Sequence, residues 1–383
     1  LGRGGMGEVF RARGAVMDRN VALKIQLPER RDDGLILAEA RATASLQHPG
    51  GVPVHDLGEL ADGRVYYTME EVAGPDMVET LDALRAASSD DAWGMTADGW
   101  TLRRLVDALA RIADTVAFAH SRGLVHCDIK PHNMMLGGFG AARITGREAR
   151  VTTRQTEAGR ILGTASYMSP EQALGDPALI DERSDVYALG RTLLDLLYGV
   201  RRAERRDGPP PPRALEQLAS ASLGRSEEMP QDGAAVAAGL RSWLDGVERK
   251  DRADRSFEAV GQFRSQADEA RSEATALRQQ AATILDGTQS WEPAETKVAG
   301  WRAEREAESL ERDAAVLDTR YEQGLRAARE LDPSHRAATE ARGELYKDGL
   351  LRAEAEGRDR EVARFATLLQ GHDGGRHVTW LRG

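Results

Sequence analysis

One string of eight residues limits what this chain of 383 residues can fold into more than any other feature. Residues 126–133 read H-C-D-I-K-P-H-N and fit the pattern H-x-D-x-K-P-x-N. Before the string, Leu, Val, Ile and Ala recur at helical spacing, and the apolar residues 134–136 follow it. The alternative is a loop with scattered polar residues, but chance occurrence of this spacing is improbable. We therefore expect a polar loop with a chemical role, held at the end of an amphipathic helix.

A glycine-rich motif opens the chain and precedes a strand that carries a lysine. The motif fits G-x-G-x-x-G-x-V, a spacing that lets a hairpin backbone approach phosphates, through Gly2, Gly4, Gly7 and Val9. Taken alone, a plain glycine-rich turn is the better interpretation. Residues 21–24 read V-A-L-K and follow at a distance suited to the return of a β-meander. Lys24 is then either a phosphate contact or an ordinary exposed strand lysine.

These motifs occur in one order, and over roughly residues 1–246 the chain resembles a eukaryotic-type serine/threonine protein kinase of bacteria. The resemblance implies an α+β, two-lobed kinase fold, with a small β-rich N-lobe over residues 1–72 and a large, mainly helical C-lobe over residues 75–246. The residue pattern agrees, because only residues 35–46 predict a helix in the small lobe. Leu1 lies inside the glycine motif, so we expect the chain to begin within this domain.

The resemblance assigns phosphoryl-transfer roles to the polar string. Asp128 would accept the proton of an attacking hydroxyl, and Lys130 would neutralise charge on the transferring phosphoryl group. Asn133 would hold a magnesium ion. Thr164, in the segment that seats the substrate, would bridge toward Asp128 and Lys130, which in this family goes with Ser/Thr rather than Tyr acceptors.

The resemblance also implies an ATP site between the lobes. The glycine loop would cover the phosphates, Val9 would cap the adenine, and Lys24 would contact the α- and β-phosphates. An active kinase needs a helix glutamate that pairs with this lysine. We assign that role to Glu39, with Glu29 or a merely solvated helix glutamate as the alternatives. The other expected nucleotide contacts are Ala22 beside the lysine, Met69 at the back of the pocket, and the hinge residues Glu70 and Val72.

The family's metal-binding D-F-G motif lacks its aspartate in this chain. The family alignment puts Gly146 at that position, followed by Arg147 and Glu148, and no aspartate occurs from residue 129 to residue 175. The metal that bridges the β- and γ-phosphates then loses a charged ligand, and a displaced Glu148 rarely restores octahedral geometry. Two functions stay open: ATP-dependent phosphoryl transfer to protein Ser/Thr, and a pseudokinase that binds nucleotide weakly and acts as a scaffold.

Cys127 is a second departure, because it replaces the arginine that usually precedes the catalytic aspartate. A phosphorylated activation loop would therefore lack its customary guanidinium partner. This makes Thr152, Thr153 and Thr156 weak candidates for phosphorylation.

A third departure concerns the segment that ends at Glu171 and resembles the family's A-P-E motif. The motif's glutamate normally pairs with an arginine, but the alignment puts Met229 there, with Arg255 as a competing assignment. With Met229, Glu171 would lose a buried partner and the large lobe would lose stability. Farther along, Asp185 would support the catalytic loop by bonding its backbone amides.

After the kinase-like part, the sequence becomes rich in Ala, Glu, Arg and Leu, with breaks only near Pro293 and Pro333. We expect an α-helical tail over residues 247–372, arranged as a hairpin or repeat, with a tetratricopeptide-like pair near residues 331–369. One such unit cannot bury its face alone, so the tail is a candidate module for binding a protein partner. Residues 373–383 are expected to start a strand of a further domain.

Charge and cysteine content argue against several classes of function. The chain has 52 Lys plus Arg and 62 Asp plus Glu, a net charge of -10, which argues against a dedicated nucleic-acid or anionic-membrane surface. Cys127 is the only cysteine, so no intrachain disulfide can form and a cytoplasmic location is the simplest assumption. No apolar stretch is long enough to cross a bilayer. The expected ligands are ATP, magnesium at a site that Gly146 weakens, and protein substrates or partners.

Overall fold

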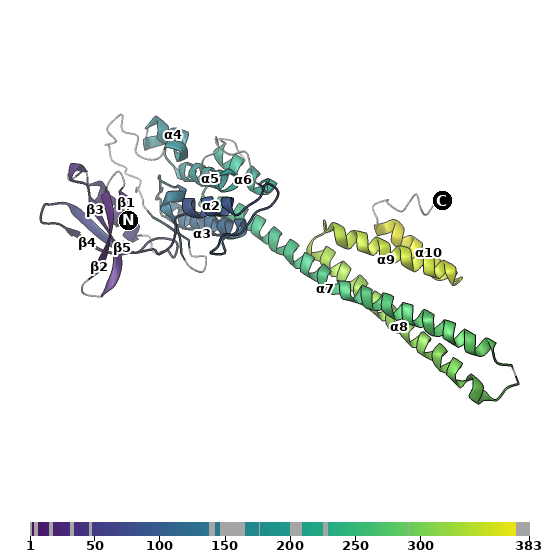
Figure 1. Cartoon of the computed structure of the whole chain (residues 1–383). Helices are drawn as coiled ribbons and strands as arrows, with labels where there is room; N and C mark the ends of the chain where they lie inside the picture. The colour runs from purple at the N-terminus through teal and green to yellow at the C-terminus, as the bar shows by residue number, and fades with distance from the viewer. Residues whose placement is uncertain are drawn as a thin grey trace. The chain divides into compact units, whose positions relative to one another are not determined.

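The chain forms two compact units, Leu1–Leu244 and Asp245–Gly383 (Figure 1). The computed structural model describes residues 2–3, 7–14, 18–30, 34–45, 48–137, 142–145, 165–175, 177–199, 209–224, 229–289 and 291–372.

The N-terminal part of the first unit is an antiparallel sheet packed against one helix. Among the described residues the sheet has five strands in the order β1-β2-β3-β5-β4. Their bounds are β1 Gly2–Arg3, β2 Gly7–Gly14, β3 Arg19–Gln26, β4 Val54–Glu59 and β5 Val65–Glu70. Helix α1, Leu35–Ser45, packs against β4 and β5, and its Ile36 and Ala40 form a small buried core with Tyr67. The helix predicted over residues 35–46 is confirmed.

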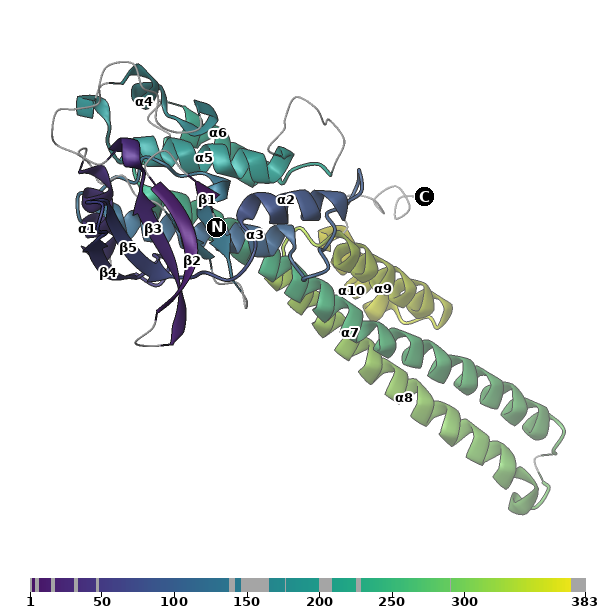
Figure 2. The same cartoon turned by 60° about the vertical axis from the view of Figure 1, so that its left-hand side comes forward.

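The rest of the first unit is mainly helical (Figure 2) and contains the main core of the chain's described residues. Its helices are α2 Met77–Ala86, α3 Leu102–His120, α4 Pro170–Leu174, α5 Glu182–Tyr198, α6 Arg213–Leu223 and the first turns of α7, Gly233–Asp286. Strands β6 Met134–Leu136 and β7 Ala142–Ile144 pair antiparallel, and 3-10 turns lie at Pro28–Arg30, Pro131–Asn133, Ala165–Tyr167 and Pro177–Leu179. Leu105, Leu109 and Ile112 of α3 share one buried cluster with Leu189 and Leu193 of α5. Burial of one face of each helix accounts for the helical spacing in the sequence.

Helix α3 positions the polar string because the helix ends shortly before it. Thr101 caps the helix by accepting the Arg104 amide N–H at 3.3 Å. The helix ends at His120, and Gly123 then adopts a φ of 70°, a left-handed conformation that favours glycine. The chain continues as a loop into the turn Pro131–Asn133 and strand β6. A polar loop at the end of an amphipathic helix was predicted and is confirmed.

The second unit is built from the remainder of α7 with α8 Ala294–Leu331, α9 Arg336–Ala355 and α10 Asp359–His372. Helix α8 packs against α9, and α9 packs against α10. A Cβ on Gly300 would lie 2.7 Å from Leu285, and one on Gly324 would collide with Val260. The start of α8 therefore lies beside the end of α7, so the two helices are antiparallel.

Buried residues, most of them small, recur every seven positions along both long helices of the second unit. On α7 they are Ala253, Val260, Ala267, Ala274 and Ala281, and on α8 they are Gly300, Ala307, Ala314, Tyr321 and Ala328. A seven-residue apolar repeat is typical of coiled coils. Ion pairs flank this seam, among them Arg271 with Asp318 and Arg278 with Glu311.

The predicted α+β, two-lobed fold with a helical tail is confirmed. Helix α7 runs without a break across Gly246, where the sequence suggested the end of the kinase-like part. Residues 373–383 lie outside the described residues. Within the part of the chain that the structure describes, no helix is long and apolar enough to span a membrane.

Candidate active site

Lys24 and Glu39 form a buried ion pair between the sheet and α1. The Lys24 Nζ lies 2.7 Å from both Glu39 carboxylate oxygens. The Glu39 side chain is 2% exposed and the Lys24 side chain is 14% exposed, so water screens this pair only weakly. The alternative candidate Glu29 lies in the turn Pro28–Arg30 and is exposed. The structure thus brings together the lysine and the helix glutamate that an active kinase needs.

Tyr67 completes this ion pair and was not selected from the sequence. It stands opposite Lys24 in the pairing of β3 with β5, and its hydroxyl donates a hydrogen bond to Glu39 Oε1 at 3.0 Å. Burial of the side chain and the adjacent Glu39 carboxylate raise the pKa of the Tyr67 hydroxyl far above its ordinary value. The neutral hydroxyl therefore stays available as a donor that holds Glu39 toward Lys24.

The polar string folds into a loop in which one carboxylate has two partners. Lys130 Nζ donates to Asp128 Oδ1 at 2.8 Å, and Asn133 Nδ2 donates to Asp128 Oδ2 at 2.8 Å. Asn133 Nδ2 also donates to the Asp128 carbonyl at 2.8 Å. The Asp128 side chain remains 31% exposed, so the carboxylate is held in place and is still open to a substrate hydroxyl.

Asp185 supports this loop from the start of α5. Its Oδ2 accepts the His126 amide N–H at 2.7 Å, and its Oδ1 accepts the Cys127 amide N–H at 2.8 Å. Cys127 has a φ of 65°, an uncommon conformation for a side chain other than glycine, and its carbonyl accepts Gln172 Nε2 at 2.8 Å. These bonds fix the two residues before Asp128. A strained residue held in this way is found where geometry matters for function.

The expected nucleotide contacts of the small lobe line the same sheet. Val9 pairs with Lys24 in the register of β2 and β3, and Ala22 is buried beside it. A Cβ on Gly7 would lie 2.7 Å from the Ile25 carbonyl oxygen, so this position requires glycine. Gly2 lies in β1, whereas Gly4 lies outside the described residues.

The connection between the lobes is tied to the strand that precedes the D-F-G position. Met69 and Glu70 end β5, and Val72 follows in a coil segment. The Glu70 carboxylate lies 2.5 Å from Arg143 Nη1 of β7, and the Glu70 backbone N–H donates to the Pro53 carbonyl at 3.0 Å.

The metal site depends on a position for which the structure gives no placement. Gly146 and Glu148 lie outside the described residues, as do Thr164 and the threonines at 152, 153 and 156. Among the described residues, no group of three His, Cys, Asp or Glu side chains is placed to hold a metal ion. Asn133 offers its amide oxygen, because its nitrogen already donates to Asp128. The described side chains therefore supply no carboxylate cluster for magnesium.

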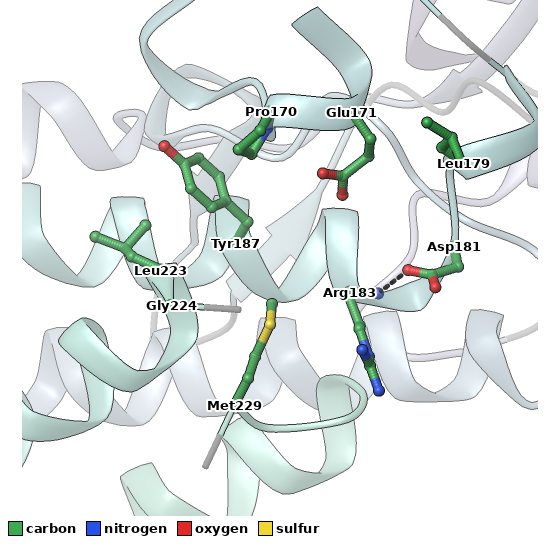
Figure 3. A pocket seen from close by; sticks show the side chains of 9 residues that line it. All are labelled: Pro170, Glu171, Leu179, Asp181, Arg183, Tyr187, Leu223, Gly224 and Met229. Atoms are coloured by element: carbon green, nitrogen blue, oxygen red, sulfur yellow. Dashed lines mark hydrogen bonds between the residues drawn. The ribbon is translucent and has the colours of Figure 1, made fainter. Parts of the chain in front are cut away.

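Glu171 and Met229 line one pocket of the first unit, and both side chains point into it (Figure 3). Met229 is buried there, whereas the competing candidate Arg255 is exposed on α7 in the second unit. The carboxylate of Glu171 accepts the Ser184 hydroxyl at 2.7 Å. The sequence predicted that Glu171 would lose its arginine partner to Met229, and in the structure the Ser184 hydroxyl donates to Glu171 instead.

Comparisons with known proteins agree with this geometry. The family model of the protein kinase domain matches residues 1–255. Serine/threonine-protein kinase pkn3 of Myxococcus xanthus is 32% identical over 289 residues, covering 66% of this chain and 49% of that protein. PrkC of Bacillus subtilis is 34% identical over 207 residues, covering 52% of this chain and 29% of that protein. PknB of Mycobacterium tuberculosis is 34% identical over 249 residues, covering 58% of this chain and 37% of that protein.

The chain spans half or less of the length of these curated relatives. All three relatives are named as serine/threonine-protein kinases of bacteria, and the family model covers about two thirds of the chain. The paired Lys24 and Glu39 and the held Asp128 occupy the places that the family's motifs require. The chain therefore belongs to the protein kinase family, in its bacterial serine/threonine branch.

Proposed function

We propose that this chain transfers the γ-phosphoryl group of ATP to serine or threonine hydroxyls of a protein substrate. The observation that carries the proposal is the loop in which Lys130 and Asn133 hold the Asp128 carboxylate at 2.8 Å. Members of the family use ATP and a divalent metal. The buried Lys24–Glu39 pair supplies the fixed ammonium group that such a nucleotide needs.

The roles of the side chains follow from their charges and partners. Asp128 would accept the proton of the attacking hydroxyl, and Lys130, beside it, would neutralise charge on the transferring phosphoryl group. Lys24 would hold the α- and β-phosphates, with Glu39 and Tyr67 keeping its ammonium group in place. A bound divalent metal supplies further neutralisation of phosphate charge, and Asn133 is the described residue that would contact it.

Gly146 favours a second candidate function, a pseudokinase that binds ATP without metal and acts as a scaffold. A missing carboxylate in a metal site weakens catalysis much more than it weakens binding through Lys24. In either case we propose that residues 1–246 form the kinase domain and that the tail over residues 247–372 is a module for binding protein partners. The exposed Trp291 and Leu351 of the tail are consistent with such contacts.

Phosphoryl transfer is tested by incubating the purified chain with labelled ATP, magnesium or manganese, and a generic basic protein substrate. Loss of the catalytic carboxylate in Asp128→Asn should reduce incorporation at least about a hundredfold. Restoring the missing ligand in Gly146→Asp should raise it about tenfold or more, because the metal then gains a charged ligand. His55→Asn, an exposed change on β4, is the control.

Incorporation that survives Asp128→Asn would contradict the proposal. Activity that occurs only with Gly146→Asp would favour the pseudokinase instead. A thermal-shift titration with ATP, with and without magnesium, then tests the binding function alone, because a ligand of the folded state raises the melting temperature.

A further inference from the structure

His120, the last residue of α3, lies between two parts of the first unit that are far apart in sequence. Its Nε2 lies 2.9 Å from Asp185 Oδ2, the carboxylate oxygen that also accepts the His126 amide. On the other side of the ring, Nδ1 accepts the backbone N–H of Gly233, the first residue of α7, at 3.3 Å. One imidazole thus joins the start of α7 to the support of the catalytic loop.

The two contacts together determine which nitrogen of the His120 ring carries the hydrogen. Because Nδ1 accepts a hydrogen from a backbone N–H, the ring hydrogen must sit on Nε2 and be donated to Asp185. The His120 side chain is 4% exposed and the Asp185 side chain is 0% exposed, so water does not compete for either bond. With its hydrogen on Nε2, the ring satisfies both partners, the Asp185 carboxylate and the Gly233 N–H.

The start of α7 is held tightly against α3, so it has little freedom to drift from His120. A Cβ on Gly233 would lie 2.7 Å from the Ala117 nitrogen and 2.8 Å from the Ala113 carbonyl oxygen, both in the backbone of α3. Two turns later Arg241 pairs with Asp114, again on α3. The same helix α7 continues without interruption to Asp286 in the second unit.

We infer that His120 is a positioning residue that couples the first turn of α7 to the catalytic loop through Asp185. Its donation to Oδ2 orients the carboxylate that holds the His126 and Cys127 amides, and these residues precede Asp128 directly. A displacement of the α7 start would withdraw the Gly233 N–H, turn the ring and loosen this carboxylate. The inference rests on the proposed phosphoryl transfer for its kinetic consequence, and the hydrogen bonds themselves can be tested without it.

Two substitutions at His120 test its hydrogen bond to Asp185 and its hydrogen bond to Gly233 separately. His120→Asn places an amide oxygen near the position of Nδ1, where it can accept from Gly233, and it removes the donor to Asp185. His120→Gln places its amide nitrogen near the position of Nε2, where it can donate to Asp185, and it removes the acceptor for Gly233. The control is His55→Asn, which changes an exposed histidine on β4.

We expect opposite patterns from the two variants in hydrogen exchange of the full chain. His120→Asn should speed exchange of the His126 and Cys127 amides and leave the Gly233 amide protected. His120→Gln should speed exchange at Gly233 and leave the loop protected. In steady-state kinetics, His120→Asn should lower kcat about tenfold to a hundredfold with KM for ATP within about twofold, because a displacement of Asp128 of about 1 Å is costly. His120→Gln should recover most of kcat.

Equal losses of kcat in both variants, or unchanged exchange at His126 and Cys127 in His120→Asn, would overturn the inference and leave His120 as a packing residue. A wild-type chain without incorporation would overturn the proposed function alone. The exchange pattern would still decide the role of His120 in that case.

Discussion

The two units bury their helices in different ways. In the first unit, large apolar residues such as Leu109, Leu189 and Leu193 fill the space between helices. In the second, the seam between α7 and α8 is lined mainly by alanines such as Ala267 and Ala274, with Val260 and Tyr321 as its larger members. As a result, the first unit buries polar groups such as Asp185 among its helices. In the second unit, the charged residues of α7 and α8 form ion pairs beside the seam. The two kinds of packing should respond oppositely to changes in side-chain size.

Shrinking a side chain should do most harm in the first unit. Leu189→Ala leaves a cavity at a residue that is 0% exposed, and such changes cost about 2–5 kcal/mol. We expect a lower free energy of unfolding for this unit in urea titrations followed by circular dichroism. The matched change Leu351→Ala, at a residue 44% exposed on α9, should cost less than about 1 kcal/mol. An equal loss of unfolding free energy in Leu189→Ala and Leu351→Ala would contradict the expectation that shrinking a side chain harms the first unit most.

Enlarging a side chain should do most harm in the second unit. Ala274→Leu places a large residue in the seam between α7 and α8, and overpacking of this kind costs about 1–3 kcal/mol. Ala276→Leu puts the same residue on an exposed position of the same helix and should change the stability by no more than about 0.5 kcal/mol. Calorimetry of the full chain distinguishes the two variants. A seam that accepts leucine as easily as the surface does would show that the helices are not closely packed.

Buried polar contacts should matter more than exposed ones, and Tyr67 tests this in the first unit. Tyr67→Phe removes the donor to a Glu39 carboxylate that is 2% exposed, so we expect a loss of about 1–3 kcal/mol. Urea titration measures it. Tyr66→Phe on the same strand is the control, because the Tyr66 side chain is only partly buried. An equal loss of unfolding free energy in both variants would contradict the proposal that Tyr67 holds Glu39 in place.

The smallest effect is expected for an ion pair at the edge of the second unit. Arg278 and Glu311 lie 2.7 Å apart, but their side chains are 57% and 44% exposed. Exposed pairs contribute about 0–1 kcal/mol and are screened by salt. Arg278→Ala should therefore change the melting temperature little, and less still in 1 M salt. If Arg278→Ala lowers the melting temperature as much in 1 M salt as in low salt, the ion pairs beside the seam contribute more to the contact between α7 and α8 than we propose.

The sequence predicted the local parts of the site better than the long-range ones. Lys24, Asp128 and Asn133 belong to short motifs that the sequence shows directly. Glu39 was assigned from its place on the one predicted helix of the small lobe, and the structure brings it to Lys24. Tyr67 and His120 act through partners on other elements, and no local pattern marks them. The register of β3 with β5 would have pointed to Tyr67, because it puts that residue opposite Lys24.

Two features of the helical tail were not predicted from the sequence: the seven-residue seam and the continuity of α7 across Gly246. Alanines at 267, 274 and 281 repeat every seven residues, so the coiled-coil seam was readable in the sequence as a period of seven. The sequence suggested that the kinase-like part ends at Gly246, and glycine usually weakens a helix, yet α7 passes through it. Packing on both sides of that position outweighs the local preference of one glycine.

The central proposal is that Lys24 binds the triphosphate of ATP, and calorimetric titration tests it most directly. ATP and adenosine are titrated into the wild-type chain, Lys24→Ala, and the control Arg13→Ala, which removes an exposed positive charge from β2. Lys24→Ala should weaken ATP binding at least about tenfold and leave the affinity for adenosine within about twofold, because the ammonium group would contact the phosphates of the nucleotide and not its base or sugar. Equal ATP affinity in Lys24→Ala and the wild type would contradict the account.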